Sequence, residues 1–302
     1  MNIWGIDLGG TKIECAVMNR TNPETNIIIR KRIPTEAFRG YEHILNQIKK
    51  LIDQVSEEIA EKPVRIGFGT PGVLDPGCET MKNCNTTCLN GKALHTDLEN
   101  LLKLPVKLAN DANCFALAET ISGVGKDYPD AEVAFGVIMG TGVGGGLVVH
   151  KKIITGHHGI AGEWGHNILE ADGERCYCGQ HGCVETVISG PALERKYTDL
   201  TGETLKLNEI YHRHLSGIDQ NATLVIERLL ENFGKAIATL ANIVDPDLII
   251  IGGGVGNIDL LYSEGYDRIK KYIFNSGKFT TPVCKPRLGD SAGVLGAALL
   301  WA

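Results

Sequence analysis

Hydrophobic residues along this chain follow two spacings in turn. Short apolar stretches predict strands at 2–6, 13–18, 64–68, 106–108, 133–139, 147–154 and 248–251. Apolar residues at helical spacing predict helices at 41–62, 111–119, 222–244 and 292–301. Asp290 or Ser291 is placed to cap the last helix. Because strands alternate with helices, we expect an α/β architecture.

Glycine-rich turns follow three of the predicted strands: Gly9-Gly10, Gly140–Gly146 and Gly252–Gly254. Glycines let backbone N–H groups approach a polyanion closely and permit positive φ angles. Three such turns in one chain predict binding of nucleotide phosphates. The first two turns share a strand–glycine–strand layout, which is a weak internal repeat with a period near half the chain. We therefore expect two duplicated lobes with a cleft between them.

The second turn also satisfies the dinucleotide fingerprint G-x-G-x-x-G at residues 140–145. That fingerprint requires a helix directly after the turn, whereas a strand is predicted here. A nicotinamide-dependent enzyme is thus the weaker alternative. No glycine-rich turn ends in the Gly-Lys-Ser/Thr of a P-loop.

A cluster of metal-binding residue types follows the second turn. His166, Cys176, Cys178 and Cys183 supply one imidazole and three thiolates, the donor set of a closed tetrahedral zinc site with a structural role. His181 lies within the same loop and is an alternative ligand. The other reading of the cysteines is that they are reduced and bind no metal.

Carboxylates with a possible role in chemistry lie near these features. Asp111 follows a short apolar strand and precedes a helix, so it is either a residue of the site at a strand's carboxyl end or a plain helix N-cap. Glu163 and Glu185 flank the cysteine cluster. A surface position is the default for both, but a rigid metal loop could also present them to a ligand.

Composition narrows the possible classes of protein. The chain has 302 residues, 43% of them hydrophobic, and a net charge of −6, which together indicate two globular domains rather than disorder. An acidic balance without basic runs argues against nucleic-acid binding. The sequence offers no membrane span and no signal peptide, and a cysteine cluster suited to metal indicates a reducing compartment. We expect a cytoplasmic protein.

Five motifs, in this order along the chain, resemble the ROK family of bacterial sugar kinases. They are the segments 7–12, 110–114, 140–146, 162–166 and 176–185. The resemblance implies an actin-like ATPase (ribonuclease H-like) fold. It also implies a small lobe of residues 1–118 plus 290–302, a large lobe of 119–289 that carries the zinc loop 166–183, and a homodimer.

The same resemblance implies roles for individual residues. Asp111 would be the general base, Asp7 would orient Mg²⁺ or its water, and His166 would contact both zinc and sugar. The hexose would be held by Gly72, Asn85, Asn110, Asp111, Glu163, His166 and Glu185. ATP would be bound by Gly5, Ile6, Asp7, Leu8, Gly9, Gly10, Thr11, Lys12, Gly140, Thr141, Gly142, Val143, Gly144, Gly145, Gly146, Leu147, Gly253 and Gly254.

The segment 83–91 is similar to one in the fructokinase/mannokinase branch of the family. We therefore expect an ATP-dependent kinase that phosphorylates the 6-hydroxyl of fructose. N-acetylglucosamine, mannose and glucose are alternative substrates, because kinases for these sugars would share nearly every other motif. A sugar-binding regulator without catalysis is a remote alternative.

Overall fold

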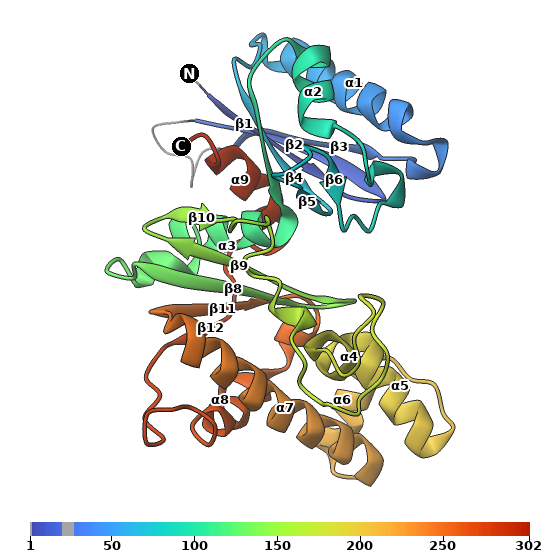
Figure 1. Ribbon diagram of the computed structural model, residues 1–302, viewed down its shortest axis with the longest axis vertical. Coiled ribbons are helices and arrows are strands. Elements are labelled where there is room, and N and C mark those ends of the chain that lie inside the picture. The colour runs from blue at the N-terminus through green and yellow to red at the C-terminus, as the bar shows by residue number, and fades with distance from the viewer. Residues whose placement is uncertain (1, 20–26) are drawn as a thin grey trace. The chain divides into compact units, whose positions relative to one another are not determined.

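The computed structural model describes residues 2–19 and 27–302. The chain divides into two compact units (Figure 1). Unit 1 comprises residues 1–127, 146–161 and 287–302, and unit 2 comprises 128–145 and 162–286. This division places 119–127, 146–161 and 287–289 in unit 1, whereas the lobes expected from the sequence assign all three segments to the second lobe.

Unit 1 contains a five-stranded sheet in the order β3-β2-β1-β4-β7. Strands β1 (Ile3–Leu8), β2 (Lys12–Met18) and β3 (Ile27–Pro34) form an antiparallel meander. Strands β4 (Ile66–Thr70) and β7 (Val106–Asn110) continue parallel to β1. The short pair β5 (Val73–Leu74) and β6 (Met81–Lys82) follows β4.

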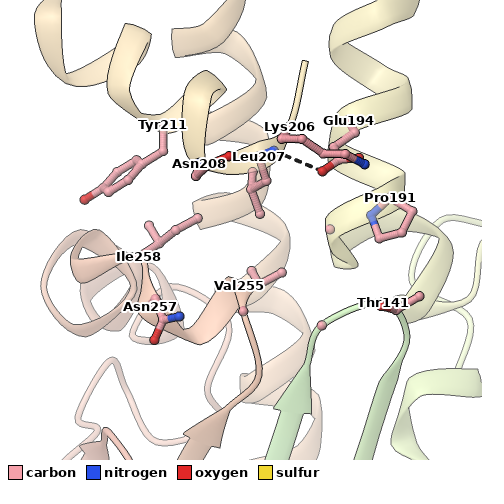
Figure 2. A pocket seen from close by; sticks show the side chains of 13 residues that line it. Thr141, Pro191, Glu194, Lys206, Leu207, Asn208, Tyr211, Val255, Asn257 and Ile258 are labelled. Atoms are coloured by element: carbon pink, nitrogen blue, oxygen red, sulfur yellow. Dashed lines mark hydrogen bonds and ion pairs between the residues drawn. The ribbon is translucent and has the colours of Figure 1, made fainter. Parts of the chain in front are cut away.

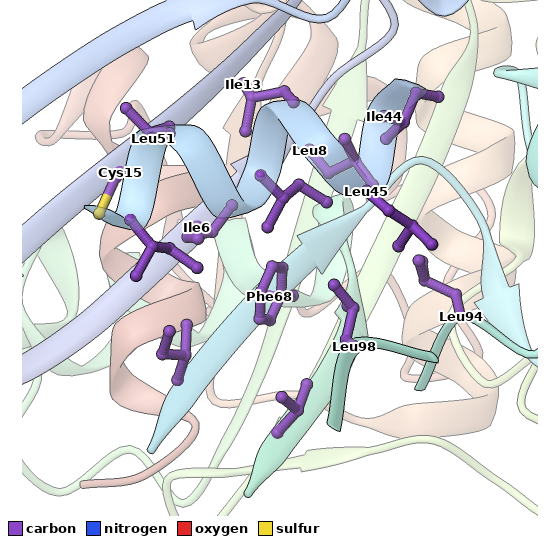
Figure 3. Close-up of a cluster of buried hydrophobic side chains, with 14 of the residues drawn as sticks. Ile6, Leu8, Ile13, Cys15, Ile44, Leu45, Leu51, Phe68, Leu94 and Leu98 are labelled. Carbon is purple, nitrogen blue, oxygen red and sulfur yellow. The ribbon is translucent and has the colours of Figure 1, made fainter. Parts of the chain in front are cut away.

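The alternation of side chains along β1 explains the packing on the two faces of this sheet. Ile6 and Leu8 point into a hydrophobic core beneath helices α1 (Tyr41–Ile59) and α2 (Leu94–Leu102) (Figure 3). On the opposite face, a Cβ on Gly5 would lie 2.3 Å from the carbonyl oxygen of Val294. Glycine at this position therefore lets helix α9 (Ala292–Leu299) pack directly on the strand, beside α3 (Asp111–Ile121).

A second five-stranded sheet has the order β10-β9-β8-β11-β12. It comprises β8 (Val133–Met139), β9 (Val143–Val149), β10 (Lys152–Ile154), β11 (Leu248–Gly252) and β12 (Val283–Cys284). Strands β8, β11 and β12 are parallel, as β1, β4 and β7 are in the first sheet. The matching strand orders confirm the α/β fold with an internal duplication.

Helices of unit 2 pack around the long helix α7 (Gln220–Val244). They are α4 (Val184–Ile188), α5 (Gly190–Thr201), α6 (Leu207–Ser216) and α8 (Glu264–Ile269). Asp219 caps α7, because its side chain accepts a hydrogen bond from the Ala222 N–H. In the part of the chain that the structure describes, no helix is long and apolar enough to span a membrane.

Three sequence predictions about local structure are wrong. The predicted glycine turn at 140–146 is shorter, because strand β9 already begins at Val143 and includes Gly144, Gly145 and Gly146. The apolar run 147–154 is two strands rather than one, because His150 and Lys151 adopt φ values of 49° and 60° and form a turn. Ser291 precedes α9, but no side chain caps that helix. The Ser291 hydroxyl instead accepts a hydrogen bond from Arg30.

Candidate active site

The β1–β2 hairpin of unit 1 forms the first glycine turn. Its tip closes through a hydrogen bond from the Gly9 N–H to the Lys12 carbonyl, 3.0 Å long. Buried Thr35 fixes this tip from outside: its N–H donates to Thr11, and its hydroxyl donates to the Gly9 carbonyl at 2.6 Å. The turn is therefore shaped before any ligand binds.

Asp7, which precedes this turn, has a pKa above that of an ordinary aspartate. Burial, and then the nearby charge of Asp111, raise the pKa of Asp7 to about 6, although Lys12 and Arg32 act in the opposite direction. A Cβ on Gly293 would lie 3.0 Å from the Asp7 Oδ2 atom. The glycine at the start of α9 thus leaves room for this carboxylate.

Asp111 lies where β7 ends and α3 begins. The N-cap of α3 is Asn110, whose side chain accepts from the Ala112 N–H at 2.9 Å, so Asp111 is the first residue of the helix rather than its cap. The Asp111 Oδ1 atom accepts from the same N–H at 2.7 Å. Asp111 is exposed to solvent, yet protein atoms crowd around its carboxyl group and this desolvation raises its pKa. An accessible carboxylate with raised proton affinity is suited to accept a proton from a hydroxyl group.

Further predicted residues gather at the carboxyl ends of β4 and β7. The hydroxyl of Thr70 lies 2.8 Å from the Gly72 carbonyl and 3.1 Å from that of Ala109, which ties the two strand ends together. A Cβ on Gly72 would lie 2.5 Å from the Cys84 sulfur, so no larger residue fits there. The Asn85 N–H donates to the Pro71 carbonyl at 3.1 Å. Unit 1 thus brings Gly72, Asn85, Asn110 and Asp111 to one edge of its sheet.

The second glycine turn, between β8 and β9, is held by α4 and α5. The Gly190 N–H donates to the Gly140 carbonyl, and the Glu185 carboxylate accepts from the Val143 N–H, each at 2.9 Å. The Trp164 indole N–H donates to the Gly144 carbonyl at 2.8 Å. Glu185 is therefore placed against the turn itself.

A cavity of about 720 Å³ opens above this turn in unit 2 (Figure 2). Gly140, Thr141 and Gly254 form one end. Beyond them, the apolar side chains of Pro191, Leu207, Tyr211, Val255 and Ile258 line the cavity together with the polar side chains of Glu194, Lys206, Asn208 and Asn257. Gly253 has a φ of 83°, and a Cβ there would lie 2.3 Å from the Met139 carbonyl oxygen. A cavity with glycine turns at one end and apolar walls beyond them suits a nucleoside with attached phosphates.

Several residues of the predicted ATP-binding loops cannot contact a nucleotide through a side chain. Ile6 and Leu8 are buried in the core beneath α1. Gly5 packs under α9, and a Cβ on Gly146 would lie 2.7 Å from the Ala112 carbonyl oxygen. At these positions the contribution to a nucleotide is limited to the backbone or to supporting the loop.

Four predicted metal ligands converge in unit 2. One ligand atom each of His166, Cys176, Cys178 and Cys183 lies within 4.8 Å of the others. The His166 Nδ1 is 3.6 Å from the Cys176 sulfur, and the Cys178 and Cys183 sulfurs are also 3.6 Å apart. Tetrahedral zinc with Zn–S bonds of about 2.3 Å separates its ligand atoms by about 3.5–3.8 Å, so the four residues fit this ion. His181 is directed elsewhere, toward the Gly173 carbonyl.

Comparison with known proteins decides the family. The family model described as "ROK family" matches residues 3–302. The chain belongs to the ROK family. An N-acetyl-D-glucosamine kinase of Pectobacterium atrosepticum is 36% identical to it over 98% of both chains.

Two solved ROK structures cover nearly the whole chain. A ROK hexokinase from Thermus thermophilus is 30% identical, with a TM-score of 0.87 over 99% of this chain and 97% of that one. A ROK family glucokinase from Streptomyces griseus, in complex with glucose and AMPPNP, is 27% identical, with a TM-score of 0.78 over 99% and 98%. These similarities confirm the actin-like ATPase fold and place the chain among ROK sugar kinases.

The sequence does not identify several residues that shape the site of this ROK protein. Thr35 and Thr70 act through hydrogen bonds to distant backbone, and Tyr211 reaches the cavity from α6. No local pattern marks such residues, because their role depends on which strands and helices become neighbours.

Proposed function

We propose that the protein is an ATP-dependent kinase that transfers the γ-phosphoryl group to the 6-hydroxyl of N-acetyl-D-glucosamine. The observation that carries the chemistry is the accessible Asp111 carboxylate at the end of β7, beside Asp7 and the first glycine turn. The choice of sugar is supported by the curated relative from Pectobacterium atrosepticum, an N-acetyl-D-glucosamine kinase.

Asp111 would accept the proton of the sugar hydroxyl as that oxygen attacks the γ-phosphorus. A sugar hydroxyl is a weak acid, so a carboxylate within hydrogen-bond reach lowers the barrier. The raised pKa of Asp111 makes it a stronger base than an ordinary aspartate. Backbone N–H groups of the turns at Gly9-Gly10 and Gly140–Gly142 would donate to phosphate oxygens.

Asp7 fits the role of a partner for Mg²⁺. Its carboxylate has a pKa near 6, so it is largely ionised at neutral pH, and the nearby Asp111 adds negative charge. Bound Mg²⁺ neutralises charge on the phosphoryl oxygens. In the apo protein, the proximity of the two carboxylates is unfavourable, which also favours a cation there.

The cavity of unit 2 would hold the adenosine of ATP. Tyr211 and Ile258 line its apolar part, where a purine ring would bury its faces (Figure 2). Thr141, Gly253 and Gly254 lie toward the glycine turns, where the phosphates would begin.

The resemblance to the family implies which residues would contact the sugar. We assign this role to Gly72, Asn85, Asn110, Asp111, Glu163, His166 and Glu185. Zinc bound by His166 and the three cysteines would have a structural role, because four protein ligands leave no open coordination position. It would hold His166 and the adjoining loop in a fixed position.

Fructose is the second candidate, favoured by the segment 83–91. The buried side chain of Cys84 packs on Gly72, and a Cβ on Gly10 would lie 3.1 Å from the Thr86 hydroxyl oxygen. The segment therefore lies between a proposed sugar residue and the first glycine turn. Its resemblance to the fructokinase/mannokinase branch makes fructose and mannose necessary competitors in any assay.

The test is ADP release from Mg-ATP with zinc-loaded protein and a panel of N-acetylglucosamine, fructose, mannose, glucose and N-acetylmannosamine. We expect N-acetylglucosamine to give a kcat/KM at least about ten times that of any other sugar, a difference of about 1.4 kcal/mol in transition-state binding. A higher value for fructose or mannose would move the substrate to the second candidate. No activity with any sugar would contradict the kinase proposal.

A further inference from the structure

Tyr177 lies between two of the metal-binding cysteines but is not itself a ligand type for zinc. Its side chain is 77% exposed, so little packing holds the ring. Nevertheless its hydroxyl lies 3.0 Å from the Nε2 atom of His166. The two rings meet edge to face, with centroids 5.2 Å apart and planes at 89°. The hydroxyl is thus directed inward while the ring stays in solvent.

The two nitrogens of His166 have different surroundings. Nδ1 faces the Cys176 sulfur at 3.6 Å, within the cluster that fits zinc. A histidine that binds metal through one nitrogen carries its hydrogen on the other. With zinc on Nδ1, Nε2 would donate the hydrogen bond and the Tyr177 oxygen would accept it. A sugar hydroxyl has the same chemistry and could accept the same bond.

The charges around the Tyr177 hydroxyl locate it further. Burial of the hydroxyl end, and then the nearby carboxylates of Glu185 and Glu163, raise the pKa of Tyr177 to about 12. Glu163, His166 and Glu185 are the three residues of unit 2 that the proposed function assigns to the sugar. The phenol hydroxyl therefore lies 3.0 Å from His166 and within electrostatic reach of the other two residues.

We propose that the Tyr177 hydroxyl occupies, in the sugar-free protein, the position at His166 Nε2 that a sugar hydroxyl takes on binding. The proposal rests on the proposed function, since it requires His166 to contact sugar. Tyr177 is a positioning residue: it keeps the Nε2–H bonded while the site is empty, and its side chain rotates away when sugar arrives. The exposed ring allows this rotation without loss of core packing.

The exchange has a measurable cost. Sugar must replace an existing hydrogen bond, whose net value corresponds to about 2- to 10-fold in affinity. Removing the phenol oxygen removes the competitor but leaves the ring. Tyr177→Phe should therefore bind the preferred sugar about 2- to 10-fold more tightly, while ATP affinity and zinc content stay as in the parent protein.

The first test is calorimetric titration of sugar into the zinc-loaded full chain and its Tyr177→Phe variant. Tyr272→Phe is the matched control, because it also removes a phenol oxygen in unit 2, one that donates to Glu231 on α7. Tighter sugar binding confined to Tyr177→Phe supports the proposal. Unchanged or weaker binding in that variant, with zinc retained, overturns it.

A second readout follows the side chain directly. In protein labelled with 3-fluorotyrosine, the ¹⁹F resonance absent from Tyr177→Phe belongs to Tyr177. We expect this resonance to shift when the preferred sugar is added, because the phenol ring loses its contact with the His166 ring. A resonance that stays unchanged at saturating sugar overturns the proposal. If the wild-type protein binds no sugar of the panel, the proposed function itself is wrong, and the displacement is wrong with it.

Discussion

The two sheets share one strand order but end differently. In the first, the third parallel strand β7 has five residues and leads straight into α3, with Asn110 and Asp111 at the junction. In the second, the equivalent strand β12 has two residues and is followed by Lys285 and Pro286 rather than a helix. The duplicated fold thus supplies a glycine turn twice but a candidate base only once.

The two glycine turns also differ in where their carboxylates come from. Asp7 belongs to the strand that enters the first turn. The second turn has no acidic residue of its own, and Glu185 reaches it from α4. Duplication therefore preserved the backbone cradle, whereas the charged groups were placed separately in each half. Four substitutions test this difference between the two turns and their surroundings.

Asp111→Asn removes the candidate base while the side chain keeps its size. We expect kcat to fall by at least about 10²-fold, because a general base contributes on this scale. The sugar KM should change much less. Steady-state ADP release with the preferred sugar measures both constants. Asp53→Asn on α1, where Asp53 pairs with Lys49 on the surface, is the control and should keep full turnover; equal turnover in both variants would remove Asp111 from the role.

Asp7→Asn tests how the carboxylate that precedes the first turn affects the free energy of unfolding. Because folding raises the pKa of Asp7 to about 6, the native state holds this proton more tightly than the unfolded state, and the stability contributed by Asp7 falls as pH rises from about 4 to about 6. Above pH 6 the variant should be more stable than the parent by about 2–3 kcal/mol, and the gain should vanish near pH 4.

Urea unfolding at pH 4, 5, 6 and 8, without ATP or Mg²⁺, measures this difference. Added Mg-ATP would stabilise the parent protein and obscure it. A gain in stability that is the same at every pH would show that the raised pKa is not the cause.

Cys178→Ser tests the metal cluster of unit 2. Loss of one thiolate should lower the zinc content and raise the sugar KM by about 10-fold, since the loop that carries His166 loses its anchor. ATP affinity should change little. Metal analysis and kinetics on the same preparation provide the readout, with Cys78→Ser, an exposed cysteine of unit 1, as the control. Full zinc content together with a normal sugar KM would contradict the structural role of the cluster.

Gly142→Ala tests the second turn. The new Cβ would lie 2.6 Å from a Glu185 carboxylate oxygen, so Glu185 must move and lose its bond to the Val143 N–H. We expect the KM for ATP or for sugar to rise about 3- to 10-fold, which corresponds to about 0.7–1.4 kcal/mol, the net value of one ordinary hydrogen bond. Glu185→Gln should raise the same KM by a smaller factor. Kinetics of Gly142→Ala that match the parent protein would argue against the contact.

Sequence reasoning was most reliable where a local pattern carries the chemistry. The four residues that fit zinc, the glycine turns and Asp111 could be named as candidates because their residue types and spacing are typical of such sites. Thr35 and Tyr211 could not, since each acts on a site formed by residues distant in the chain. The turn at His150-Lys151 was missed because neither residue is typical of positive φ.

The proposed substrate shows the same limit. Motifs for ATP, zinc and the base are shared among sugar kinases of the family, so they leave the choice of hexose to a few side chains around the sugar. The segment 83–91 favours fructose, whereas the relative from Pectobacterium atrosepticum favours N-acetylglucosamine. Fold and reaction class therefore follow from the sequence more directly than the substrate does.

The chemical structure of the product shows directly whether the protein phosphorylates the 6-hydroxyl of N-acetyl-D-glucosamine. Protein, Mg-ATP and N-acetyl-D-glucosamine are incubated, and the product is examined by ³¹P–¹H correlation NMR. We expect a phosphomonoester whose ³¹P signal is coupled to the two protons on C6. It should form in an amount equal to ADP and should be absent with Asp111→Asn. Inorganic phosphate alone, or a phosphomonoester at another carbon, would contradict it.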